Sequence, residues 1–133
     1  MLSFKAFLAF AVLATAVTAL AIPRAAADVI APAVTHPTAG TVWHVGALET
    51  VTWDTSSVPA WSENTGVLLL GFVEADDPSG NEHLDVDHPL AAGFRLADGA
   101  VKVTVPDVVP RDDYVVALIG DSGDVSGMFI IVP

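Results

Sequence analysis

The chain has 133 residues, no cysteine and a formal net charge of −11 at pH 7. A surface of this sign repels nucleic acids and anionic lipid headgroups, which leaves neutral glycans, cations and basic proteins as possible partners. The lack of cysteine excludes disulfides, thiolate zinc sites and a cysteine nucleophile, so the stability of the fold depends on an apolar core.

Residues 1–21 are predicted to be a secretory signal peptide. Lys5 precedes an uncharged stretch from Ala6 to Ile22, which contains the cleavage-type sequence Ala19-Leu20-Ala21. A second such sequence, Ala25-Ala26-Ala27, gives an alternative end at residue 27. Because Ala and Thr dilute the stretch, a transmembrane anchor is disfavoured. We expect a secreted protein with no membrane span after cleavage and a single domain over residues 28–133.

The region after residue 27 is strongly anionic. It holds all 16 acidic residues but only three basic ones, Arg95, Lys102 and Arg111. It contains no Asn-x-Ser/Thr glycosylation sequence, and its C-terminal residues are too few for an anchor signal. These features predict a freely secreted acidic domain.

Short β-type segments separated by turn residues follow one another along this domain. Their spacing predicts an all-β fold, an Ig-like or fibronectin-III-like Greek-key β-sandwich of about seven to eight strands. The pair Asp98-Gly99 predicts a two-residue hairpin between two of these strands. The predicted strands are Ala33–Thr35, Thr41–Val45, Glu49–Asp54, Gly66–Glu74, Gly93–Leu96, Ala100–Val105, Asp113–Gly120 and Met128–Val132.

Two tryptophans are assigned different environments. In Glu49–Asp54, Val51 and Trp53 alternate with polar residues, which makes Trp53 the predicted central core aromatic. Trp61 instead lies in the polar stretch from Thr55 to Thr65. An indole in such a loop can stack on a sugar ring; the alternative is an anchor tucked over the end of the sandwich.

The acidic segment from Glu74 to His88 is the densest cluster of metal-capable groups. If Glu82–His88 is extended, His83, Asp85 and Asp87 share one face. An imidazole with two carboxylates can hold a divalent transition ion, and the same oxygens can accept sugar hydroxyls. The alternative is a solvated acidic hairpin whose charge prevents edge-to-edge pairing.

The same segment also carries oxygen donors suited to calcium. Asp76, Asp77 and Asn81 could supply them, but their spacing fails the calcium-loop pattern, which requires acidic or amide residues at alternate positions before a glycine.

The C-terminal third contains the pattern of a tyrosine corner. Val108, Pro110, Asp112 and Tyr114 occupy alternate positions before an apolar run. We expect Pro110 to end the preceding strand and the Tyr114 hydroxyl to bond to the backbone just upstream. Tyr114, Val116 and Leu118 should then share one face.

No catalytic residue is expected. Gly120-Asp121-Ser122-Gly123 resembles the nucleophile segment of trypsin-like proteases, but the chain lacks the rest of that machinery and is too short for its double barrel. The tetrapeptide is therefore interpreted as a turn before the last strand. No pair of carboxylates stands out for glycoside hydrolysis, and no cofactor is expected.

Several short motifs of the domain occur together in one order. They are His36-Pro37, Gly40-Thr41-Val42-Trp43, Val51-Thr52-Trp53-Asp54, Asn81-Glu82-His83-Leu84-Asp85, Asp87-His88-Pro89-Leu90, Gly120-Asp121-Ser122-Gly123 and Phe129. In this order they resemble the N-terminal domain of fungal cell-wall-synthesis proteins involved in β-1,6-glucan assembly. That domain also occurs in the family of Ser-Thr-rich glycosylphosphatidylinositol-anchored membrane proteins. The likeness extends from Ala33 to the end of the chain and implies a β-sandwich at the fungal cell wall, here without the stalk or anchor of many members.

These observations lead to three hypotheses. The first is a secreted, non-catalytic domain that binds glucan or a wall protein, with Trp61 stacking on a sugar and His83, Asp85 and Asp87 accepting its hydroxyls. The second is a secreted acidic interaction protein with a basic protein partner. The third is a weak divalent-metal binder that uses the same His83 group. No nucleic-acid partner is expected.

Overall fold

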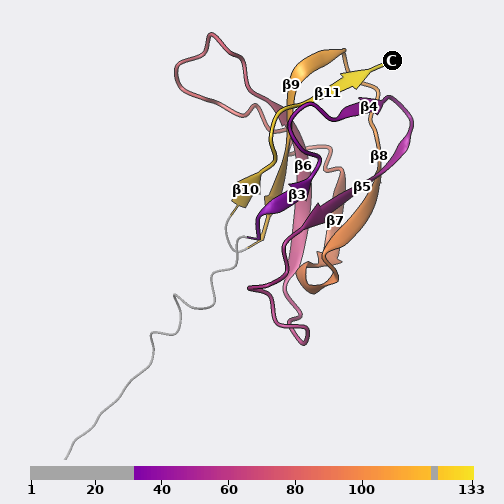
Figure 1. Ribbon diagram of the computed structural model, residues 1–133, viewed down its shortest axis with the longest axis vertical. Coiled ribbons are helices and arrows are strands. Elements are labelled where there is room, and N and C mark those ends of the chain that lie inside the picture. The colour runs from indigo at the N-terminus through magenta and orange to yellow at the C-terminus, as the bar shows by residue number, and fades with distance from the viewer. Residues whose placement is uncertain (1–31, 121–122) are drawn as a thin grey trace, which may run out of the picture.

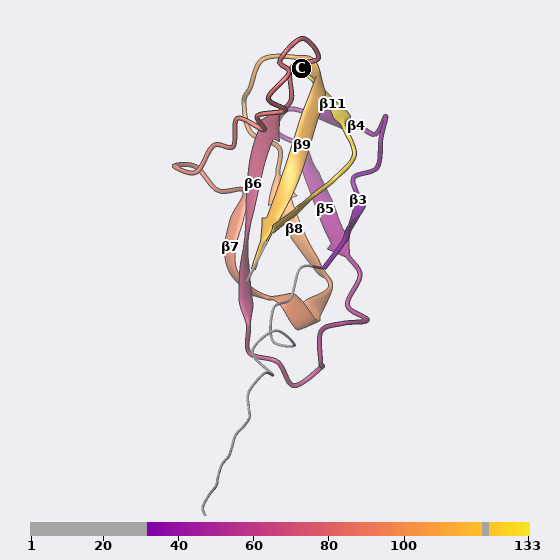
Figure 2. The same ribbon diagram turned by 90° about the vertical axis from the view of Figure 1, so that its left-hand side faces the viewer.

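The β-strands of the protein form two facing sheets in the computed structural model, which describes residues 32–120 and 123–133. This confirms the predicted all-β sandwich (Figures 1 and 2). The larger sheet has the order β4-β11-β9-β6-β7, with β10 beside β9, and the smaller has the order β3-β5-β8. The bounds are β3 Val34–His36, β4 Val42–His44, β5 Leu48–Trp53, β6 Thr65–Phe72, β7 Ala91–Arg95, β8 Ala100–Thr104, β9 Arg111–Ile119, β10 Gly123–Val125 and β11 Phe129–Val132.

All eight predicted strands are present, with ends within two residues of the expected ones. β10 was not predicted, because three residues are too few to show an alternating pattern. It pairs antiparallel with the end of β9, so Gly120-Asp121-Ser122-Gly123 leads into β10 and not directly into the last strand. Asp121 and Ser122 themselves lie outside the described residues, as does the predicted signal peptide. The described residues contain no helix long and apolar enough to cross a bilayer.

The predicted Asp98-Gly99 hairpin is wrong. β7 and β8 belong to different sheets, and a short 3₁₀ helix, Leu96–Asp98, joins them. Gly99 ends that helix in the left-handed region with φ of 75°, a conformation that glycine adopts without strain. Leu96 is fully buried, and its carbonyl accepts a 2.7 Å hydrogen bond from Trp53 Nε1. The turn therefore carries the chain across the core from one sheet to the other.

The core lies between the sheets and contains the tryptophan that was expected there. Trp53 is 4 % exposed, which confirms its predicted position. Its ring contacts Phe94, with centroids 5.3 Å apart. Trp43 and Phe129 form a second aromatic pair at 4.7 Å, and both are fully buried. Burial of this aromatic surface together with the aliphatic core stabilises a domain without disulfides.

The tyrosine corner is also confirmed, but the predicted role of Pro110 is wrong: the preceding strand β8 already ends at Thr104, and Pro110 stands directly before β9. The Tyr114 hydroxyl donates to the carbonyl oxygen of Val109, five residues upstream, at 2.5 Å. The side chain is 4 % exposed, and burial raises the pKa of the phenol above its ordinary value of 10.0. Val116 and Leu118 share the buried face of β9 with Tyr114. This bond fixes the β8–β9 connection against the end of the sandwich.

Candidate functional site

The two groups of predicted site residues lie at opposite ends of β6. Loop 54–64, which carries Trp61, precedes this strand, and loop 73–90, which carries the acidic segment, follows it. In Figures 1 and 2 the first loop lies at the bottom of the molecule and the second near the top. β6 has eight residues, so the loops are separated by about 25 Å at the usual rise of a strand. The structure therefore does not bring Trp61 together with His83, Asp85 and Asp87.

Trp61 projects from its loop into solvent. It is 79 % exposed, so the alternative of an anchor tucked over the sandwich is wrong. Val58 and Ser62 are the buried residues of the loop. Arg95 Nη2 donates to the carbonyl oxygens of Ala60 at 3.1 Å and Ser62 at 2.8 Å, the residues on either side of Trp61 in the chain. The loop is thus tied to β7, and its tryptophan contributes little to holding it there.

The acidic segment is not the extended strand that the alternation predicted. Residues 81–85 have no strand assignment, and His83 has a φ of 42°, a left-handed conformation that breaks the alternation. The backbone instead returns along β6, where Phe72 N donates to Glu82 O at 2.9 Å and Asp85 N donates to Leu70 O at 2.9 Å. The predicted shared face of His83, Asp85 and Asp87 is therefore wrong.

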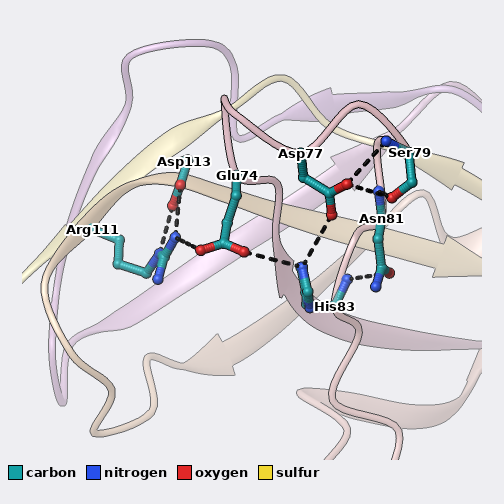
Figure 3. A network of polar contacts seen from close by, with 7 residues as sticks. All are labelled: Glu74, Asp77, Ser79, Asn81, His83, Arg111 and Asp113. Atoms are coloured by element: carbon teal, nitrogen blue, oxygen red, sulfur yellow. Dashed lines mark hydrogen bonds and ion pairs between the residues drawn. The ribbon is translucent and has the colours of Figure 1, made fainter.

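The members of that predicted group have different neighbours. Asp85 lies 3.2 Å from Nδ1 of His88, which is exposed to solvent, and Asp87 is also exposed. His83 turns instead toward the start of the loop, where Nε2 is 3.6 Å from Glu74 Oε1 and 3.9 Å from Asp77 Oδ2 (Figure 3). One ligand-type atom from each of Glu74, Asp77 and His83 lies within 4.8 Å of the others.

Asp77 is oriented by the turn that it begins. The backbone N and the Oγ of Ser79 donate to its Oδ1 at 2.9 and 2.7 Å, which lowers the pKa of Asp77. This leaves Oδ2 free to face His83. Asn81 Oδ1 accepts from the backbone N of His83 at 3.0 Å. Two of the oxygens considered for calcium are therefore engaged in local hydrogen bonds.

An ion pair between Arg111 and Asp113 lies on the other side of Glu74 from His83 (Figure 3). Arg111 makes a two-pronged interaction with Asp113 at 2.7 and 2.9 Å, which lowers the pKa of Asp113 and raises that of Arg111. Arg111 Nη2 is 3.9 Å from Glu74 Oε2. The Phe72 ring contacts both the imidazole and the guanidinium. His83 stacks on it with ring centroids 4.4 Å apart, and Arg111 Cζ lies 4.0 Å from its centroid.

Two shallow hollows flank the β8–β9 connection among the described residues. One, of about 320 Å³, is lined by Phe72, His83, Asp85 and Tyr114 together with residues 107–109. The other, of about 460 Å³, lies across the same connection beside Val45. Glu74 and Asp77 line neither hollow. A ligand held by these residues and His83 would therefore bind at the rim of the hollow that His83 lines, near solvent.

The sequence pattern predicted His83 as a site residue and, separately, Asp77 as a possible calcium donor, whereas Glu74 was not singled out within the acidic segment. The grouping of these three residues in one cluster was not predicted. The signal that could have found them is the short Asp77-Pro78-Ser79-Gly80 sequence, a turn-forming combination that reverses the chain and brings the residues before it back against those after it.

Comparisons of the chain with protein-family models, curated proteins and solved structures find no match. The fungal resemblance accordingly rests on the motifs quoted above, and the site is interpreted from its geometry.

Proposed function

We propose that the protein is a secreted, non-catalytic β-sandwich that binds a neutral polysaccharide of the fungal cell wall through Trp61. The observation that carries this proposal is an exposed indole on a loop that other residues hold in place. An exposed indole offers a large, flat apolar face for stacking, and tryptophan is enriched at binding interfaces. A sugar ring presents an apolar C–H face to such an indole.

The charge of the domain supports a neutral ligand. All 16 acidic residues fall after residue 27, and a surface of that sign disfavours anionic polymers. The Trp61 loop itself carries Asp54 and Glu63, and the Arg95 side chain lies 4.0 Å from that of Glu63. A neutral sugar is not repelled by these acidic groups.

We further propose that the sandwich is Ig-like. β4 runs parallel to β11, which joins an early strand to the last one, while β6, β9 and β11 lie consecutively in the larger sheet. A tyrosine corner at the strand before the last hairpin is a hallmark of this class. The cell-wall location follows from the motif resemblance alone, and the secreted state from the predicted signal peptide.

The test is co-sedimentation of the purified protein with insoluble fungal glucan and with chitin, at low and high salt. We expect it to pellet with one polymer at both salt concentrations, because stacking on a neutral sugar is not screened by ions. Trp61→Ala should abolish pelleting and leave the melting temperature nearly unchanged, whereas Trp61→Tyr should retain part of it.

Leu48→Ala provides the matched control. Leu48 is 66 % exposed on β5, so this variant also removes exposed apolar surface, but away from the loop, and it should pellet like the parent protein. Full pelleting by Trp61→Ala would overturn the proposal, as would an absence of pelleting with either polymer. Pelleting that disappears at high salt would indicate charge-driven binding and favour a basic partner.

A further inference from the structure

His83 Nε2 is a buried nitrogen without a hydrogen-bond partner, although the ring as a whole is 30 % exposed. Its separations from Glu74 Oε1 and Asp77 Oδ2, 3.6 and 3.9 Å, exceed the roughly 2.7–3.2 Å of an N–H···O hydrogen bond. A buried polar atom that is left unpaired is costly and calls for an explanation, and a bound ion is one such explanation.

The separations agree with atoms that share one ion. Two ligand atoms each about 2.1 Å from a tetrahedral metal are about 3.4 Å apart. The two observed separations are only slightly longer, and the three ligand-type atoms all lie within 4.8 Å of one another. Glu74 is exposed and Asp77 half-buried, so both carboxylates have room for the small shift that full coordination requires.

We propose that Glu74, Asp77 and His83 form a binding site for a divalent first-row transition ion, with zinc as its best match. The donor set is one neutral imidazole nitrogen and two carboxylate oxygens. Calcium and magnesium prefer oxygen donors alone, whereas zinc accepts this mixture and reaches four-coordination with one further ligand from solvent.

Neighbouring groups orient His83 and Asp77. The Phe72 ring stacks on the imidazole with an interplanar angle of 6°, which fixes the plane of the ring. Asn81 Oδ1 accepts from the His83 backbone, and Ser79 directs Asp77 through Oδ1. Supporting contacts of this kind orient metal ligands and strengthen binding.

The charge around the cluster also favours a cation. Arg111 is the basic residue that approaches it, and its guanidinium is neutralised by Asp113. Glu74 and Asp77 contribute two negative charges. Among the described residues, no basic side chain other than those of Arg111 and His83 lies within 4.0 Å of either carboxylate. This site is at the other end of β6 from Trp61, so its existence does not depend on glycan binding.

The experiment is calorimetric titration of the purified, untagged protein with ZnCl₂, followed by Ca²⁺ as a comparison. We expect one zinc per chain and no heat with calcium. His83→Ala should abolish binding, and Asp77→Asn and Glu74→Gln should each weaken it at least about tenfold. Asp77→Asn keeps the Oδ1 acceptor for Ser79, so it removes the charge without removing the turn.

His88→Ala is the matched control. His88 also lies beside a carboxylate of the same loop, Asp85, at 3.2 Å, but both side chains are exposed. Its variant should bind zinc like the parent protein. Substitution of Co²⁺ for Zn²⁺ should add visible absorption bands of four-coordinate cobalt in the parent and in His88→Ala, but not in His83→Ala.

Three outcomes would overturn the proposal. An absence of zinc binding would mean that the cluster is an ion pair only. Equal binding by His83→Ala would place the ion elsewhere, and loss of binding by His88→Ala alone would assign it to the Asp85 pair. Circular dichroism establishes that each variant is folded. If His83→Ala does not fold, the tenfold loss in Asp77→Asn and Glu74→Gln decides the question.

Discussion

The loop that carries Trp61 is held by backbone turns and by the guanidinium of Arg95, whereas loop 73–90 at the other end of β6 is held by backbone bonds to β6 and by the side chain of Asp77, one of its own candidate ligands. In the first loop the exposed indole contributes little to the conformation, so it can be replaced without disturbing the loop. In the second, Asp77 could bind a ligand and also orders the backbone of its turn through Ser79. Substitutions therefore separate binding from stability at the Trp61 end more cleanly than at the His83 end.

The largest effect is expected where the His83 loop contacts β6 most closely. A Cβ on Gly71 would lie 2.1 Å from Glu82 O and 2.7 Å from Leu84 Cδ2. Gly71→Ala must therefore displace the returning segment, at a cost of about 1–3 kcal/mol in the free energy of unfolding. Zinc binding should be lost while glucan pelleting is retained. Urea unfolding with both binding assays checks this; unchanged zinc affinity would contradict it.

Tyr114→Phe should have the next largest effect. It removes the hydrogen bond to Val109 and should cost about 0.5–1.5 kcal/mol in the free energy of unfolding. Burial raises the pKa of Tyr114 above 10.0, so the unfolded chain loses the phenolic proton first as pH rises. The parent protein should accordingly lose stability above about pH 10, and the variant should lack this contribution. Urea unfolding at several alkaline pH values measures the difference; identical pH profiles would contradict it.

Arg95→Ala tests how the other end is held. The variant loses both hydrogen bonds to the Trp61 loop, and because the side chain is partly exposed we expect a cost of about 1 kcal/mol in the free energy of unfolding. Glucan pelleting should weaken because the loop is less ordered, while zinc titration should be unchanged. Pelleting equal to that of the parent would show that Trp61 does not need this support.

The smallest expected effect concerns Asp113. Its pKa is lowered by the hydrogen bonds from Arg111, so the pair stabilises the fold above 3.8, the ordinary pKa of an aspartate, and this stabilisation is lost as pH falls through the lowered value. As the pH falls below about 4, the stability of Asp113→Asn should therefore decrease less than that of the parent protein. Thermal melting at acid pH measures this. A steeper acid loss in the variant would contradict it.

Features that depend on a few neighbouring residues could be predicted from the sequence. The tyrosine corner joins residues only five positions apart, and the alternation around Trp53 indicates its buried face without reference to the rest of the fold. The strands likewise follow from local apolar periodicity and turn residues. For the candidate site, the sequence indicated His83 and Trp61 as residues of interest. The predicted neighbours of His83 were wrong, and the exposure of Trp61 was left undecided.

By itself, the sequence determined an acidic, cysteine-free all-β sandwich with Trp53 and Tyr114 in its core. Only the tertiary structure decided that Asp98-Gly99 belongs to a crossing between sheets, that Trp61 faces solvent, and that His83 meets Glu74 and Asp77. The reason is physical. Each of these outcomes depends on backbone segments that approach one another across the fold, as the returning segment does at Gly71, and local periodicity carries no information about such distances.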